Sequence, residues 1–319
     1  MQLYTLENNF IRIRFLDIGA SIYTFEIKPK NYRNIVLSLA NLNDYKTAAS
    51  GYFGATIGRV AGRIDKGVFK INNKTYQTQL NEKNTNSLHG GHESFAFKKF
   101  RLIKQTLTEL VFEYVSVDGE GGYPAEVKLH VIYTLRDVGL EINYKATTTM
   151  DTILNITNHS YFNLDGDGTI LNHILKANAT HYYTHDKKQL NDELIVNTSD
   201  SPFYIKEGKK LQDIILHPLV NKEPAMGFDH LLLIDGLLTF KTKDITLEVI
   251  SNYPAVQMYS TNFPSNLLLV GHKLVNLYHA LAIEPVDIVR SQNQTFNNLL
   301  VTKSKPYERT IRYIIKISD

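Results

Sequence analysis

The chain has 319 residues, of which 43% are hydrophobic and 21% are charged, with a formal net charge of +3 and no cysteine. This is the composition of a globular protein with a large core, and it argues against disorder. The small net charge gives no reason to expect a nucleic-acid partner, and the lack of cysteine excludes disulfides, thiol nucleophiles and thiolate metal sites.

The N-terminal stretch and the apolar runs bear on where the protein resides. Residues Met1–Thr5 contain neither the basic nor the apolar segment that is typical of a signal peptide. No uninterrupted apolar run approaches the length of a membrane span. We therefore expect a cytoplasmic protein without a membrane partner.

The first part of the chain predicts short strands separated by turns. Phe10–Phe15 alternates apolar residues with arginine, which is typical of a half-buried strand, and Ser21–Lys28 is expected to be the next strand. Asn41–Ala49 is expected to form a short helix with an Asn or Asp cap. The segment Gly51–Arg63 that follows is apolar and rich in glycine.

The rest of the chain continues in the same manner. Between residues 165 and 229 the pattern loosens and turn residues predominate. Many short strands with no long amphipathic helix favour a sandwich or barrel, so we expect one all-β, mostly antiparallel domain over residues 1–319. Further strands are predicted at 67–71, 75–80, 99–106, 110–117, 126–135, 140–147, 231–234, 245–250, 255–259, 278–283 and 309–317.

The segment Asn155–Leu164 places a histidine where a strand is expected to end. The run Ile153–Thr157 is rich in β-branched residues and leads into His159, whose side-chain type titrates closest to neutral pH. His89 follows a short apolar stretch, and Glu284 ends another. Each residue alone has a simple structural explanation, but together at three strand ends they would form an acid–base pocket.

Two further segments are candidates for ligand binding, and one is rejected. Arg59 and Arg63 place guanidinium groups in an apolar, glycine-rich stretch, and Asp229 lies between an aromatic residue and a histidine just before a strand. His181 and His185 have the i,i+4 spacing of a zinc-binding helix, but the adjacent glutamate is missing and the intervening Tyr-Tyr favours a strand. We therefore expect no metal site.

Several segments, in order along the chain, resemble the motifs of the aldose 1-epimerase (galactose mutarotase) family. The most specific are Asn-Ser-Leu-His-Gly-Gly at 86–91 and Asn-His-Ser-Tyr-Phe-Asn-Leu at 158–164. The resemblance runs from Phe10 to Ile315. It implies a β-supersandwich fold and interconversion of the α and β anomers of free hexoses such as galactose and glucose, without metal or cofactor. The other matching segments are 54–63, 67–69, 118–124, 227–230, 256–263 and 282–284.

The resemblance also implies roles for individual residues. Glu284 corresponds to a general base, His159 to a general acid, and His89 to a second histidine that binds and polarises the sugar. The residues implied in substrate binding are Arg63, Asp229 and Gln257. The chain departs from the usual motifs at Gly62, where many members have asparagine, and at Pro285-Val286, so sugar preference is not implied.

Mutarotation requires that one proton leaves the anomeric hydroxyl while another reaches the ring oxygen, followed by C1–C2 rotation and the reverse steps. We expect Glu284 and His159 on opposite sides of the sugar ring, with burial raising the pKa of Glu284 and with His159 kept protonated by its neighbours. Two alternatives remain: an epimerase for hexose 6-phosphates, which would need an Arg/Lys cluster, and a non-catalytic sugar-binding protein. The expected partner is a small hexose, with the protein a monomer or homodimer.

Overall fold

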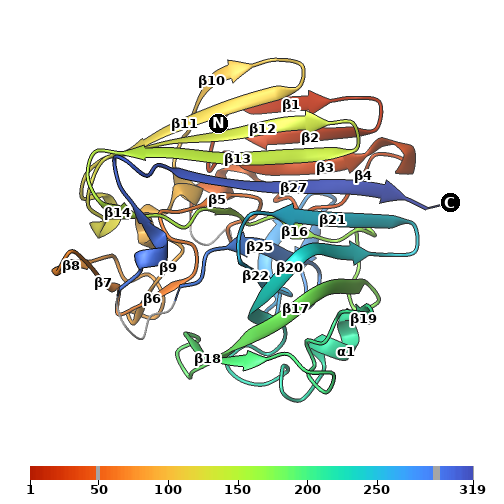
Figure 1. Cartoon of the computed structure of the whole chain (residues 1–319). Coiled ribbons are helices and arrows are strands. Elements are labelled where there is room, and N and C mark those ends of the chain that lie inside the picture. The colour runs from red at the N-terminus through yellow and green to blue at the C-terminus, as the bar shows by residue number, and fades with distance from the viewer. Residues whose placement is uncertain (48–50, 290–294, 319) are drawn as a thin grey trace.

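The computed structural model describes residues 1–47, 51–289 and 295–318 and consists mostly of strands (Figure 1). A four-stranded sheet is formed by β1 (Leu3–Glu7), β2 (Ile11–Leu16), β3 (Ser21–Ile27) and β4 (Arg33–Asn34). The predicted strands at 10–15 and 21–28 are confirmed as β2 and β3. The alternation of apolar residues and arginine in β2 corresponds to alternating buried and half-buried positions.

The largest sheet among the described residues has 13 strands and curves through the molecule. Figure 1 shows β11, β12, β13 and β27 side by side, with β21, β20 and β17 continuing the sheet below them. In order, its main path is β10 (Arg101–Gln105), β11 (Glu109–Ser116), β12 (Val127–Arg136), β13 (Gly139–Thr148), β27 (Tyr307–Ile317), β21 (Ile245–Ser251), β20 (Asp229–Lys241), β22 (Ala255–Tyr259), β25 (Leu281–Val286) and β16 (Tyr161–Phe162). Off this path, β17 (Ile174–His185) pairs with β20, β18 (Asn191–Val196) and β19 (Lys209–Lys210).

Short two-stranded pairs and helical turns complete the described fold. The pairs are β14 (Thr152–Ile153) with β26 (Leu300–Val301), β15 (Thr157–Asn158) with β5 (Thr56–Ile57), β6 (Arg63–Asp65) with β9 (Asn86–Leu88), β7 (Val68–Ile71) with β8 (Lys74–Gln77), and β23 (Ser265–Leu269) with β24 (Lys273–Val275). The helices are α1 (Leu211–Ile215), η1 (Lys28–Lys30), η2 (Leu42–Lys46), η4 (Gly91–Glu93), η5 (Phe95–Phe97), η6 (Glu120–Gly122) and η8 (Asn297–Leu299). Asn41 caps η2 as expected, whereas residues 48 and 49 of that predicted helix lie outside the described residues.

The main core lies between the four-stranded sheet and the large sheet. Phe15 of β2 packs on Tyr133 of β12 with ring centroids 4.5 Å apart, and Phe25 of β3 belongs to the same buried cluster. All ladder pairs are antiparallel, so the prediction of an all-β, mostly antiparallel fold is confirmed. The assignment of residues 1–319 to one domain stays a prediction. No helix in the described part of the chain is long and apolar enough to cross a membrane.

The segment around His159 differs from the predicted strand. Instead of one strand over 153–157, it contains the two-residue strands β14, β15 and β16, all buried. The His159 carbonyl accepts a hydrogen bond from the Gly54 amide and its own amide donates to the Ala55 carbonyl, both at 2.9 Å. Gly54 has φ +66°, and a Cβ there would lie 1.9 Å from the Ile22 carbonyl oxygen. Only glycine therefore fits where the chain fixes the His159 backbone.

Candidate active site

One face of three neighbouring strands forms a wall of a pocket of about 490 Å³. In β20, β22 and β25, alternate residues point into the pocket, while their chain neighbours Leu232, Met258 and Ile283 are buried in the main core. A cavity of this size accommodates a small ligand such as one hexose. The pocket-facing residues of these strands are Asp229, Leu231, Gln257, Tyr259, Glu284 and Val286.

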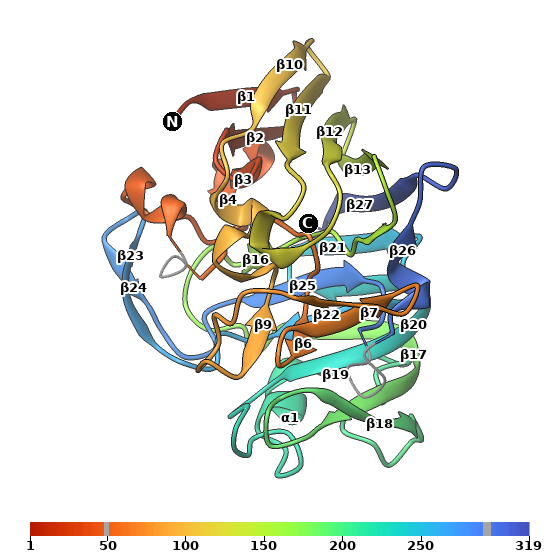
Figure 2. The ribbon, with the colours of Figure 1, turned by 90° about the vertical axis from the view of Figure 1, so that its left-hand side faces the viewer.

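The opposite wall comes from segments that are distant in sequence. Arg63 begins β6, and His89 follows β9, its antiparallel partner. His159 lies between β15 and β16, and β16 pairs with β25. Figure 2 shows β6 and β9 close to β22 and β25, whose residues line the same pocket. The six predicted site residues are therefore brought together, although Glu284 lies within β25 and not at a strand end.

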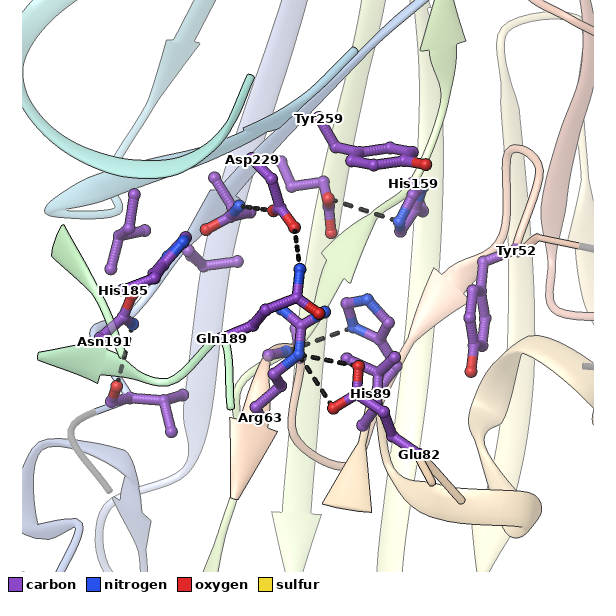
Figure 3. Close-up of a pocket in the computed structure, with 18 of the residues that line it drawn as sticks. Tyr52, Arg63, Glu82, His89, His159, His185, Gln189, Asn191, Asp229 and Tyr259 are labelled. Atoms are coloured by element: carbon purple, nitrogen blue, oxygen red, sulfur yellow. Dashed lines mark hydrogen bonds and ion pairs between the residues drawn. The ribbon is translucent and has the colours of Figure 1, made fainter. Parts of the chain in front are cut away.

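His159 and Glu284 are in direct contact at the base of the pocket. The His159 Nε2 atom lies 3.4 Å from Glu284 Oε1, and both residues are buried (Figure 3). The expectation that they flank a sugar ring is wrong for this geometry, because a ring does not fit between atoms at that distance. Both groups can instead contact the same part of a bound ligand.

Burial shifts the pKa values of this pair in opposite directions. Burial, reinforced by the negative charge of Asp229, raises the pKa of Glu284 well above its usual value, although Arg63 opposes the shift. Burial lowers the pKa of His159 to about 4. The expected direction for Glu284 is confirmed, but the expectation that neighbours keep His159 protonated is wrong. These shifts favour the protonated, neutral carboxyl on Glu284 and the neutral imidazole on His159.

His89 is oriented by a backbone hydrogen bond. The Gly62 amide donates to His89 Nδ1 at 3.2 Å, so the neutral ring carries its proton on Nε2. Burial, together with the charges of His159 and Arg63, lowers the pKa of His89 well below its usual value. A neutral imidazole fixed in this tautomer donates a hydrogen bond through Nε2 and suits a sugar oxygen.

The same three side chains are the metal-ligand candidates among the described residues. Ligand atoms of His89, His159 and Glu284 lie within 4.8 Å of one another. A metal ligand must offer a lone pair, but His89 Nδ1 already accepts the Gly62 N–H and Nε2 carries the proton. The donor set therefore fits a metal poorly, and the expectation of a reaction without metal or cofactor stays a prediction.

The two arginines singled out in the sequence have different environments. Arg63 lines the pocket, and its Nε donates to both carboxylate oxygens of Glu82 at 3.0 Å, which leaves the terminal nitrogens for a ligand. Arg59 is buried elsewhere and donates to Ser116 Oγ and to the carbonyls of Ser116, Val117 and Pro124 at 2.8–3.0 Å. Arg59 therefore fixes a loop, and only Arg63 can bind a ligand in the pocket.

Asp229 and Gln257 are linked across two strands. Gln257 Nε2 donates to Asp229 Oδ1 at 2.6 Å, and Gln257 is also the register partner of Glu284. This bond holds one carboxylate oxygen of Asp229 in place. Asp229 and the free amide oxygen of Gln257 can then accept from hydroxyl groups, as a sugar-binding wall requires.

Aromatic rings support His159 from two sides. Its ring centroid lies 4.9 Å from that of Tyr161 and 5.8 Å from that of Tyr52. The Asn158 side chain fixes the neighbouring backbone instead, because its Nδ2 donates to the Gly54 carbonyl at 2.8 Å. Phe162 packs instead on Tyr313 in the core. Of the two aromatic residues in this motif, Tyr161 is therefore the one whose ring packs against His159.

Sequence reasoning missed part of the pocket lining. Glu82, which fixes Arg63, lies in a polar loop with no motif to distinguish it. His185 was considered only as a metal ligand, yet it lines the pocket and stacks on His230 at 5.1 Å. The other missed lining residues with polar side chains are Tyr52, Lys83, Gln189, Asn191, Tyr259 and Asp287.

Comparison with known proteins gives one consistent result. The family model described as Aldose 1-epimerase matches residues 2–313 of this chain. The galactose mutarotases of Pongo abelii and Homo sapiens are each 34% identical to it over 329 aligned residues, which cover 97% of this chain and 92% of theirs. A crystal structure of an aldose epimerase homologue from C. elegans has a TM-score of 0.89 at 24% identity and covers 100% of this chain and 99% of that one.

Proposed function

The chain belongs to the aldose 1-epimerase family, and we propose that His159, Glu284 and His89 carry out its reaction, the interconversion of the α and β anomers of a free hexose. The observation that supports these roles best is the 3.4 Å contact between His159 Nε2 and Glu284 Oε1 inside the pocket. The anomeric hydroxyl and the ring oxygen are both bonded to C1. Two adjacent proton-transfer groups can therefore reach both oxygens at once.

The pair performs the reaction with one proton. When one member takes the proton of the anomeric hydroxyl, the other delivers a proton to the ring oxygen, and the C1–O5 bond breaks to give the open-chain aldehyde. Rotation about C1–C2 and reversal of the transfers closes the ring as the other anomer. For Glu284 to start as the base, the proton of the pair must first move to His159. When the proton stays on Glu284, His159 starts as the base and Glu284 delivers the proton to the ring oxygen. Both orders use the same two atoms.

The remaining pocket residues bind the sugar. His89 donates through Nε2 to a sugar oxygen, while Arg63, Asp229 and Gln257 bind hydroxyl groups away from the reacting pair. These assignments follow from the position of each polar group in the pocket and from hydroxyls being both donors and acceptors.

The charges in the pocket favour a free hexose over a hexose 6-phosphate. Arg59, which the sequence offered as a candidate for ligand binding, donates its hydrogen bonds to the 116–124 loop and does not line the pocket. In the described residues, the pocket cations are Arg63 and Lys83, and Arg63 is already paired with Glu82. The carboxylate of Asp229 would repel a dianionic phosphate, so a hexose 6-phosphate is disfavoured. The carboxylate–histidine pair also argues against a module that only binds sugar.

Polarimetry tests the proposed function directly. We expect the protein to accelerate the optical-rotation change of freshly dissolved α-D-galactose or α-D-glucose, and to accelerate that of the corresponding 6-phosphates much less. The rate without protein is subtracted in each case. Failure to accelerate either free sugar, with saturable binding retained, would favour the sugar-binding alternative.

The pKa shifts predict the pH dependence of kcat/KM. Activity requires the pair to hold one proton. As the pH falls, protonation of His159 adds a second proton, and its lowered pKa puts this limb near pH 4. As the pH rises, the raised pKa of Glu284 delays loss of the last proton, so activity persists well above the pH at which an ordinary carboxyl is ionised. An acid limb near pH 6.5, the value of an ordinary imidazole, would contradict this assignment.

A cytoplasmic location and a monomeric or homodimeric state stay predictions, and size-exclusion chromatography with light scattering tests the second.

A further inference from the structure

Gln189 extends from the turn between β17 and β18 into the pocket. Its Nε2 lies 3.3 Å from Asp229 Oδ2, and Figure 3 shows its carboxamide between Asp229 and Arg63. The neighbouring Lys187 and Lys188 are exposed, whereas Gln189 is half-buried. The glutamine thus enters the site while the two lysines that precede it are exposed to solvent.

The turn is constructed so that Gln189 is held in this position. Asp186 Oδ1 accepts hydrogen bonds from the amides of Lys188 and Leu190 at 2.8 and 2.9 Å, and the Asp186 carbonyl accepts from the Gln189 amide at 3.0 Å. Gln189 itself has φ +60°, a conformation that is uncommon for a residue with a side chain. A residue other than glycine in this conformation suggests that its side chain is used.

The same turn is also tied to the opposite wall of the pocket. Lys188 Nζ lies 3.3 Å from Asp65 Oδ1 in β6, and the Lys188 carbonyl accepts from Asn86 Nδ2 of β9 at 3.1 Å. Asn191 Nδ2 donates to the Val289 carbonyl at 3.1 Å. The turn therefore bridges the wall that carries Arg63 and the wall that carries Asp229.

The hydrogen bonds of Asp229 differ in a way that leaves room for a ligand. Oδ1 is held by Gln257 at 2.6 Å, whereas within the described part of the chain Oδ2 receives only the longer bond from Gln189. A carboxylate only accepts, so the carboxamide nitrogen faces Asp229, and the Gln189 oxygen and second N–H stay available. Across the pocket, Gly62 contributes no side chain, so no polar group comes from that position.

We propose that Gln189 is a sugar-positioning residue, which together with Asp229 Oδ2 binds one hydroxyl group of the hexose away from the anomeric carbon and so contributes to sugar specificity. The inference rests on the proposed mutarotase function. On binding, the hydroxyl donates to Asp229 Oδ2 and accepts from the Gln189 amide, replacing their mutual bond. Gln189 does not touch the His159–Glu284 pair, so its effect falls on KM and not on kcat.

The test compares Gln189→Gly with Lys187→Gly. Glycine removes the carboxamide and suits φ +60°, so a loss in Gln189→Gly does not arise from backbone strain. Lys187→Gly shortens an exposed side chain in the same turn and controls for loosening of the loop. We expect Gln189→Gly to raise KM for galactose or glucose by roughly threefold to tenfold with kcat unchanged, and Lys187→Gly to change neither.

A set of 2-, 3-, 4- and 6-deoxy hexoses separates a contact from a general loosening. If Gln189 binds one hydroxyl, the sugar that lacks this hydroxyl has the same KM with wild type and Gln189→Gly, while the others keep the difference. An unchanged KM for the parent sugars, or an equal shift for all deoxy sugars, would overturn the proposal. If wild type fails to accelerate mutarotation, that result by itself refutes only the proposed function. Calorimetric affinities of wild type and Gln189→Gly for galactose and glucose still show whether Gln189 contributes to sugar binding. Wild type that binds neither sugar would refute both.

Discussion

Glu284→Gln is expected to lower kcat for mutarotation by roughly 10²–10⁴-fold, the usual contribution of one proton-transfer group. The amide neither takes nor delivers a proton, so the pair can no longer exchange its proton with the sugar. Because burial raises the pKa of Glu284, the wild-type pocket favours the neutral carboxyl, which glutamine matches in size and charge. The fold and the affinity for sugar should therefore be largely retained. Polarimetry and calorimetry measure the two quantities.

Glu141→Gln is the matched control for this substitution. Glu141 is also a buried carboxylate, but it lies in β13, where it pairs with Arg136 and Arg312. Its replacement is expected to reduce stability and leave kcat unchanged. If Glu284→Gln retained full activity, Glu284 would not be a proton-transfer group. An equal loss in both variants would assign the effect to folding.

Much of the sheet could be predicted because its strands show simple patterns. The strand predicted at 255–259 has the bounds of β22, and those at 126–135 and 140–147 differ from β12 and β13 by one residue at each end. In these strands one face packs in the core and the alternation of residues is regular. By contrast, the strand predicted at 278–283 is shifted in the structure to β25, because Glu284 and Pro285 look like the end of an apolar run.

The region 165–229 was harder to predict, and it contains the turn that carries Gln189. β17 does alternate, with Leu175, Ala177 and Ala179 buried and the residues between them exposed. Alanine gives a weak apolar signal, and the abundant turn residues around the strand obscured it. Gln189 follows Lys187-Lys188, a pair that indicates a solvated loop. Its inward orientation depends on hydrogen bonds to distant residues, which no local pattern encodes.

The candidate site was predicted better than its electrostatics. The motifs identified His89, His159 and Glu284, and the structure places all three in one pocket. The protonation of His159 was mispredicted because it depends on how completely the tertiary structure removes the ring from water. Likewise, residue type alone made both Arg59 and Arg63 candidates, whereas the resemblance implied only Arg63, and the packing of the 116–124 loop gives the physical reason why Arg59 does not face the pocket.

His159→Asn is expected to lower kcat by a similar factor, roughly 10²–10⁴-fold, because Asn has no group that titrates or reaches Glu284 Oε1 in the same way. His173→Asn is the matched control. His173 is fully buried, stacks on Phe240 at 4.9 Å and accepts the Leu164 amide, away from the pocket. The control should lower the melting temperature and leave kcat unchanged. A fully active His159→Asn protein would exclude this histidine from proton transfer.

Combining His159→Asn with Glu284→Gln tests whether the two residues act as a pair. If one proton is exchanged between them and the sugar, loss of either member disables the other, so the double variant should be about as slow as the slower single variant. Independent acid and base roles would instead multiply the two losses, to roughly 10⁴–10⁸-fold. The contact at 3.4 Å and the opposite pKa shifts favour the first outcome. Stopped-flow or polarimetric rates for wild type, the two single variants and the double variant, each corrected for the spontaneous rate, distinguish the two outcomes. Multiplied losses would contradict the shared proton.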